Sequence, residues 1–229
     1  MSDVLTLALD TSTSCLSVAL LKGDSLACEI NLFVKAGHSG MILPVIDAAL
    51  NKSSISRHEI GLIAVGIGPG SFTGLRIGIA TAKGLAMALG CPLAGIPTLD
   101  AIARGTLPSP TQIMPILDAK KGEVFCALYR KNGSRISDFM NVKPGEIAAQ
   151  IDKDTLFIGN GCSLYRDLLK HDLGENYHEG PAHLWHPRAS VIGLMALEIP
   201  TRDLPSDVLP LYVRASDATL ILEKKGSGH

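Results

Sequence analysis

The sequence contains few aromatic residues, few charged residues and no paired cysteine motif. Phe, Trp and Tyr make up 4% of its 229 residues, so we expect a core built from Ala, Val, Ile and Leu. Charged residues make up 19% and hydrophobic residues 46%, a balance that excludes an intrinsically disordered chain. The length allows one large domain or two small ones.

The chain also lacks an excess of charge of either sign. It has 21 Lys and Arg against 22 Asp and Glu, for a net charge of -1. This balance argues against broad electrostatic wrapping of nucleic acid. It is still compatible with a local basic patch. The high apolar content raises the hypothesis that another chain covers part of the surface.

The cysteines and the chain start indicate a cytoplasmic protein. The five cysteines are widely spaced and form no Cys-x-x-Cys, so neither a zinc ribbon nor a disulfide framework is expected. The start, Met-Ser-Asp-Val, lacks the basic and apolar segments of a signal peptide. No apolar run approaches the ~20 residues of a membrane helix. Residues 226–229 read as an appended linker.

A strand that ends in aspartate and continues into a hairpin occurs twice. Residues 4–8 lead to Asp10, and residues 113–117 lead to Asp118. This repetition predicts a duplicated α/β unit rather than a simple doubly wound sheet. We expect a first domain over residues 1–104, a smaller second domain over 105–204, and a C-terminal segment, 205–222, that packs back on the first. Helices are predicted at 41–50, 75–89, 99–103, 144–151, 164–170 and 189–197.

The most distinctive segment is Gly68-x-Gly70-x-x-x-Gly74, between a predicted strand at 60–67 and the helix at 75–89. Glycine-rich approaches to helix N-termini bind anions well, but this spacing fits neither a dinucleotide fingerprint nor a nucleotide P-loop. A turn that needs glycine conformations is the alternative. Together with Asp10 and Ser12, Gly68 and Gly70 are candidates for a weak nucleotide or anion contact. For Asp10 and Ser12 the alternative is a simple hairpin turn.

The helix at 75–89 and the glycine before it carry small residues at every fourth position. Gly74, Gly78, Ala82, Ala86 and Gly90 therefore form one smooth face. Each helical glycine costs roughly 1 kcal/mol relative to alanine, so close packing has to offset that cost. Two interpretations stay open: packing on the chain's own sheet, or packing against a partner helix.

Catalytic and metal-binding signatures are missing. A metal pair on a helix needs a second histidine four residues after His38, and that position is Ile42. We therefore expect His38 to be a helix-start or surface residue. No Gly-x-Ser-x-Gly is present. We predict no catalytic residue and no bound metal.

Five segments together resemble one protein family: LALDTSTSCLSVALL, HSGMILPVIDAAL, AVGIGPGSFTGLRIGIATAKGLA, ILDAKKGEVFCALY and LPLYVR. The sequences of these segments and their order along the chain are similar to those of the TsaB (YeaZ) family of bacterial tRNA threonylcarbamoyladenosine biosynthesis proteins. The resemblance runs over residues 5–214 and is most specific at residues 68–78.

The resemblance implies an actin/Hsp70/sugar-kinase-like fold of two related α/β domains, the second one reduced. It implies a partner and activator subunit with no active site and no cofactor of its own. Family members bind the related catalytic subunit TsaD, and the ATPase TsaE joins that pair. The complex installs threonylcarbamoyl on A37 of tRNAs reading codons that begin with A. We expect a homodimer when TsaD is absent, and tRNA contact only through the complex.

By the same resemblance, the helices at 41–50 and 75–89 form the joint with TsaD. The residues predicted for that interface are Ile42, Ile46, Ala49, Gly74, Gly78, Ala82 and Ala86.

The sequence departs from nucleotide-using relatives at two loops. Ser12 replaces the glycine of their Asp-x-Gly phosphate loop, and residues 159–161 read Gly-Asn-Gly where an adenosine loop has Gly-Gly. Two alternatives remain: a small-molecule kinase of the same fold with Asp10 or Asp118 as base, and a metallopeptidase-like hydrolase. The roles of Asp118 and of the Lys120-Lys121-Gly122 turn are left open.

Overall fold

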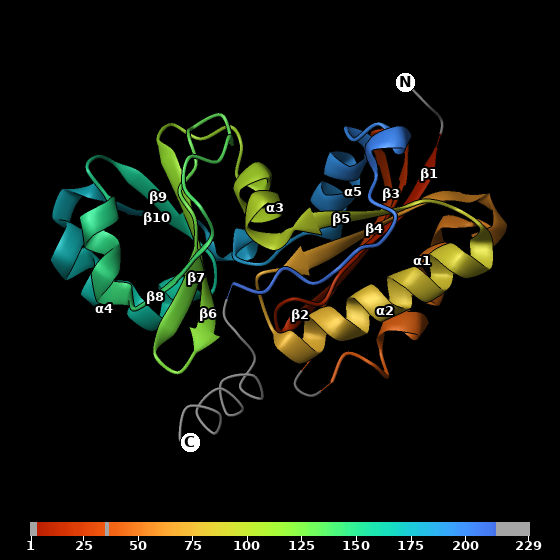
Figure 1. The fold of residues 1–229 in the computed structure, drawn as a ribbon, viewed down its shortest axis with the longest axis horizontal. Coiled ribbons are helices and arrows are strands. Elements are labelled where there is room, and N and C mark those ends of the chain that lie inside the picture. Colours follow the sequence, from red (N-terminus) through yellow and green to blue (C-terminus); the bar gives the residue numbers. More distant parts are fainter. Residues whose placement is uncertain (1–3, 35–36, 214–229) are drawn as a thin grey trace, which may run out of the picture.

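The computed structural model describes residues 4–34 and 37–213, which form two five-stranded mixed sheets (Figure 1). The strand order of the first sheet is β3-β2-β1-β4-β5. Its strands are β1 (Leu5–Asp10), β2 (Cys15–Lys22), β3 (Ser25–Phe33), β4 (Ile60–Gly68) and β5 (Leu93–Pro97). The three strands β1 to β3 pair in antiparallel fashion, and β4 and β5 continue the sheet in parallel with β1.

The second sheet repeats this topology, with the order β10-β9-β6-β7-β8. Its strands are β6 (Gln112–Lys120), β7 (Glu123–Cys126), β8 (Met140–Val142), β9 (Thr155–Ile158) and β10 (Tyr177–Glu179). Here β6 takes the place of β1: it pairs antiparallel with β7 and parallel with β9. The predicted duplication of an α/β unit is confirmed.

The helices show why the second unit is the smaller one. The α-helices are α1 (Ile42–Ser53), α2 (Phe72–Leu89), α3 (Thr98–Gly105), α4 (Gly161–Leu173) and α5 (Ala189–Leu197). Where the first unit has α1, the second has only a 3-10 helix, Pro144–Gln150, at the place where the sequence predicted a short helix. Further 3-10 turns lie at Arg57–Glu59, Gly174–Asn176, Ala182–Leu184 and Thr201–Asp203. Among the described helices, none is both long and apolar enough to cross a bilayer.

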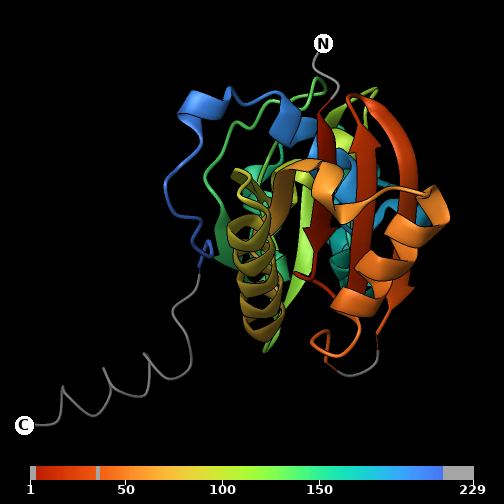
Figure 2. The ribbon, with the colours of Figure 1, turned by 90° about the vertical axis from the view of Figure 1, so that its right-hand side faces the viewer.

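Helices cover both faces of the first sheet (Figures 1 and 2). Leu7 and Leu9 pack with α1 and α2 in one core cluster, and Ala8 packs with α5 in another. The alternation follows from the strand, because successive side chains of β1 point to opposite faces.

The position of α5 corrects the predicted domain boundary. Although α5 follows the second sheet in the chain, it packs on the first, where an added Cβ on Gly193 would overlap Leu21. The reason is its composition: α5 is apolar nearly all round and needs a covered position, which the first sheet and α3 provide (Figure 1).

The C-terminal segment lies along the first sheet as far as it is described. Val208 joins the core under α2, and the Leu211 N–H donates to the Ile67 carbonyl at 2.8 Å. The rest of the segment predicted to pack back, 214–222, and the linker at 226–229 lie outside the described residues.

Candidate functional site

The loop between β1 and β2 is a buried turn. Asp10 is fully buried, and its Oδ1 accepts hydrogen bonds from the Ser12 N–H at 2.9 Å and the Ser12 hydroxyl at 2.8 Å. This geometry matches the turn that the sequence offered as the alternative to a phosphate loop. The Ser12 hydroxyl is therefore engaged with Asp10.

The second carboxylate oxygen of Asp10 has no hydrogen-bond partner among the described residues. It lies over Gly66, where an added Cβ would overlap it. Burial raises the pKa of Asp10 to about 7, against the opposing effect of the two bonds from Ser12. Position 66 accordingly needs a glycine to leave room for the carboxylate.

The glycine-rich segment packs directly on this loop. An added Cβ on Gly70 would lie 2.5 Å from the Ser12 carbonyl oxygen, and one on Gly74 or Gly78 would overlap Thr11. The Thr11 hydroxyl donates to the Gly74 carbonyl at 2.7 Å. The glycines thus let α2 approach the loop backbone to hydrogen-bonding distance.

These contacts separate the four residues predicted for an anion contact. Ser12 and Gly70 line the cleft between the two sheets, whereas Asp10 and Gly68 are not part of its wall. Gly68 has φ +107°, and an added Cβ there would lie 2.8 Å from the Leu75 side chain. An anion contact through Asp10 and Gly68 is therefore wrong for this structure, while one through Ser12 and Gly70 stays a prediction.

The cleft between the two sheets has a volume of about 680 Å³, within the range of small-molecule pockets. Its walls come from the loop after β1, the start of α2, the β6–β7 hairpin and the last described residues. The lining includes Ser12, Thr13, Ser14, His38, Ser71, Phe72, Thr73, Asp118, Lys120, Lys121, Asn160, Tyr212 and Val213.

The β6–β7 turn in this cleft is held by Asp118. Asp118 accepts from the Lys120 N–H at 2.8 Å and from its ammonium group at 2.6 Å. Its own N–H donates to Asn160 Oδ1 at 3.0 Å. Lys120 and Lys121 have φ values of +63° and +57°, a left-handed backbone conformation that residues other than glycine and asparagine rarely adopt. Asp118 thus stabilises a strained turn.

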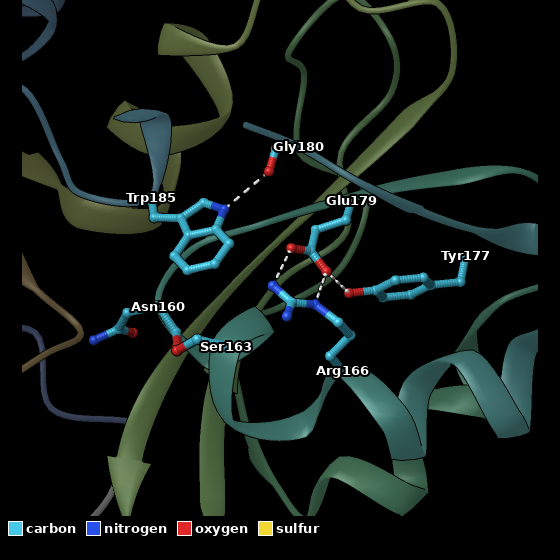
Figure 3. Close-up of polar contacts among 7 residues, drawn as sticks. All are labelled: Asn160, Ser163, Arg166, Tyr177, Glu179, Gly180 and Trp185. Carbon is cyan, nitrogen blue, oxygen red and sulfur yellow. Dashed lines mark hydrogen bonds and ion pairs between the residues drawn. The ribbon is translucent and has the colours of Figure 1, made fainter. Parts of the chain in front are cut away.

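Several polar groups of the second domain bind one another (Figure 3). Arg166 donates to both carboxylate oxygens of Glu179, at 2.7 and 2.6 Å, and Tyr177 donates to the same group at 2.8 Å. The Trp185 indole N–H donates to the Gly180 carbonyl at 3.0 Å. In the Gly-Asn-Gly loop, Gly159 and Gly161 abut the Ile116 carbonyl. The loop therefore serves packing on β6.

His38 is buried, so the expectation of a surface residue is wrong. Only 8% of its surface is exposed, and its Nε2 lies 2.8 Å from the Thr13 carbonyl oxygen. Because a carbonyl only accepts, Nε2 carries the proton. The helix-start role holds, since the His38 carbonyl accepts from the Ile42 N–H. Sequence reasoning missed His186, whose Nδ1 lies 3.2 Å from the Thr13 hydroxyl.

The residues predicted for a partner interface are in the chain's own core. Ile42, Ile46, Ala49, Ala82 and Ala86 are at most 8% exposed, and Gly74 and Gly78 are buried with them. Of the two interpretations of the Gly/Ala face, packing on the own sheet is the correct one. The prediction that these seven residues contact a partner is therefore wrong for this structure.

The exposed sides of α1 and α2 carry a different set of apolar and small residues. Leu43 and Met87 are 55% and 83% exposed, and an added Cβ on Gly84 would meet nothing within 4 Å. We call this set the outer helix surface: Met41, Leu43, Pro44, Ala80, Gly84, Met87 and Ala88. Within residues 4–34 and 37–213, no three His, Cys, Asp or Glu side chains are placed to hold a metal ion.

Comparison with known proteins gives the family. A family model described as "TsaD: tRNA N6-adenosine threonylcarbamoyltransferase" matches residues 33–199. The chain is 32% identical to the tRNA threonylcarbamoyladenosine biosynthesis protein TsaB of Bacillus subtilis, over 93% of this chain and 95% of that protein.

Solved structures agree with this result. YeaZ from Pseudomonas aeruginosa superimposes with a TM-score of 0.74 at 26% identity, over 93% of this chain and all of that one. The (R)-2-hydroxyglutaryl-CoA dehydratase component A of Acidaminococcus fermentans has a TM-score of 0.54 at 14% identity, over 85% and 98% of the two chains, and shares the fold alone. The predicted actin/Hsp70/sugar-kinase-like fold is confirmed. The chain belongs to the TsaD-related proteins and, among them, to the TsaB (YeaZ) family that takes part in threonylcarbamoyladenosine biosynthesis on tRNA.

Proposed function

We propose that this chain is a subunit without an active site of its own, which binds a TsaD-type transferase and activates it. The transferase family's model matches this chain itself, so subunit and enzyme are expected to share related helix pairs. Related chains can associate about a pseudo-two-fold axis through equivalent surfaces. The outer helix surface is the observation that carries the proposal.

Gly84 gives the sharpest argument for a partner on this surface. A glycine in the middle of a helix costs roughly 1 kcal/mol relative to alanine. Gly74 and Gly78 are required because they touch Thr11, but nothing of the described chain approaches position 84. A helix of another chain that packs closely over Ala80, Gly84 and Ala88 would supply the missing reason. Met87, on the same exposed side of α2, would then be covered as well, which removes apolar surface from water.

Further parts of the proposal follow from the family. A TsaE-type ATPase joins the pair, tRNA is reached only through the complex, and the isolated chain forms a homodimer through the same surface. All five cysteines are free in the structure, which fits a cytoplasmic location.

The two enzymatic alternatives have less support from the geometry. A kinase needs a base that reaches its substrate, and Asp10 is fully buried and bonded to Ser12. Asp118 is held by Lys120 and Asn160 in the β6–β7 turn. A metallopeptidase would use histidine ligands, and the Nε2 of His38 binds the Thr13 carbonyl.

The test is co-purification with a TsaD-type subunit, followed by tRNA modification. The assay contains that subunit, a TsaE-type ATPase and the enzyme that makes threonylcarbamoyl-AMP, with or without this chain. We expect modification only with the chain present, and loss of both binding and modification in Gly84→Arg and Met87→Asp. Leu164→Asp, at a 57% exposed leucine of α4, is the matched control and should behave as wild type. Full activity without the chain, or equal loss in the control, would contradict the proposal.

A further inference from the structure

Three titratable side chains, two of them buried and one half-buried, converge on the short loop at residues 11–14. Asp10 begins it, His38 binds the Thr13 carbonyl, and His186 contacts the Thr13 hydroxyl. The loop in turn holds the start of α2, because the Ser71 N–H donates to the Ser12 carbonyl at 2.7 Å. A change of charge at the base of this loop would therefore act on every one of these contacts.

The described surroundings of Asp10 offer its second carboxylate oxygen nothing cationic. On β4 it faces Gly66, and the α5 residue next to that glycine is Ile192. In the β1–β2 ladder, Asp10 stands opposite Ser17. The nearby Cys15 thiol has a pKa raised to about 11, first by burial and then by the Asp10 charge.

Charged groups on the neighbouring elements are engaged elsewhere. Glu29 of β3 binds Arg188, which precedes α5, and α2 has no acidic residue in its first turn. Across the cleft, Lys120 binds Asp118, and Lys121 also lines the cavity wall. An ionised Asp10 is thus left with only the two bonds from Ser12, and one oxygen stays dry and unpaired.

We propose that Asp10 is a proton-controlled switch for the loop at residues 11–14. With a proton on Asp10, the loop stays packed between β1 and α2. Without it, the loop opens toward the interdomain cleft, where Ser12, Thr13 and Ser14 already form part of the wall. Opening lets water reach the carboxylate and removes the cost of a buried, unpaired charge.

Two hydrogen bonds tie the loop to α2 and would change when it opens. The bonds from Ser71 to Ser12 and from Thr11 to Gly74 would break or lengthen, so the first turn of α2 would lose part of its anchoring. Burial raises the pKa of Asp10 in the packed loop to about 7, so opening should become more favourable as pH rises from the ordinary aspartate range toward neutral. The inference does not depend on partner binding.

The experiment follows Asp10 and the loop directly in the full chain. The carboxyl ¹³C resonance of Asp10 is titrated from acid to alkaline pH, and amide hydrogen exchange is measured at Ser12 and Ser71. We expect one titration step of the carboxyl carbon near neutral pH. Between the ordinary aspartate range and this step, exchange at both amides, corrected for its intrinsic pH dependence, should rise by up to roughly tenfold per pH unit, and above the step it should level off. In Asp10→Asn the corrected exchange should not change with pH.

Two results of these measurements would overturn the Asp10 switch. A carboxyl carbon that titrates in the ordinary range of aspartate overturns the proposal, as does corrected exchange that rises equally in Asp10→Asn. His186→Gln should keep the step, since burial lowers the pKa of His186 and leaves it neutral in this range. If Asp10→Asn does not fold, the carboxyl titration and the Ser71 exchange of the unchanged chain still confirm or refute the switch.

Discussion

Gly78 of α2 and Thr11 of the loop after β1 are in direct contact. A Cβ atom on Gly78 would overlap the Thr11 hydroxyl oxygen, and that hydroxyl donates to the carbonyl of Gly74, one turn earlier in α2. The glycine motif therefore joins a helix to a loop of the same chain, and the surface available to a partner lies on the opposite side of α2.

Two glycines of α2 should respond to alanine in opposite directions. Gly78→Ala forces a methyl group into Thr11, and overpacking of this kind costs ~1–3 kcal/mol of unfolding free energy. Gly84→Ala adds a methyl group in open space and should stabilise the isolated chain by up to ~1 kcal/mol. Urea unfolding of both variants measures the difference. A change of the same sign in both would contradict this assignment of the two helix faces.

Glu29 should contribute stability that is lost in acid. Burial alone would raise its pKa, but bonds from Ser190 and the Arg188 pair outweigh burial and lower it. A lowered pKa means that the contribution is present above the ordinary glutamate value and disappears as pH falls through the folded one. Glu29→Gln should therefore lose less stability than wild type on acidification, and be less stable by ~1–3 kcal/mol at neutral pH. If the unfolding free energies of the two proteins fell equally as the pH is lowered, this prediction would be refuted.

Asp10 should show the opposite pH dependence. Its pKa is raised to about 7, so the folded chain binds the proton more tightly than the unfolded chain. Its contribution is complete below the ordinary aspartate value and is lost as pH rises toward 7, by up to roughly 4 kcal/mol. We expect the stability difference between wild type and Asp10→Asn to shift by an amount of this order over that range. A difference that does not change with pH would show that Asp10 ionises as it does in water.

The local parts of the fold could be predicted from the sequence. The sequence predicts both strand-and-hairpin units, whose first strands lead to Asp10 and Asp118, because apolar runs and turn residues are local signals. The start of α2 fell within three residues of the prediction, and its end at Leu89 was placed correctly. The strand Tyr177–Glu179 was missed, since Tyr-His-Glu has no alternating apolar pattern.

The site could be predicted only in part, because its key contacts join distant segments. The small-residue face of α2 was visible, but whether it meets the sheet or another chain depends on how α2 is rotated over β1. The burial of His38 depends on the Thr13 carbonyl, 25 residues away in the sequence. Residue spacing does not report such a contact, so the sequence left the two interpretations of the face open.

The isolated chain should self-associate through the outer helix surface. Leu43 and Met87 lie on neighbouring helices that cover the same face of the first sheet, at 55% and 83% exposure. A two-fold contact would bury each of them against the equivalent surface of a second copy, and stable dimers bury about 800 Å² on each partner. Light scattering at micromolar concentration should therefore give a dimer mass for wild type. Met87→Asp places an uncompensated charge in that contact and should give a monomer whose unfolding midpoint is that of the wild-type monomer. Leu164→Asp makes the same kind of change on α4, away from this surface, and should leave the dimer intact. A wild-type chain that is monomeric throughout, or a dimer that survives Met87→Asp and dissociates in Leu164→Asp, would place the contact elsewhere on the molecule.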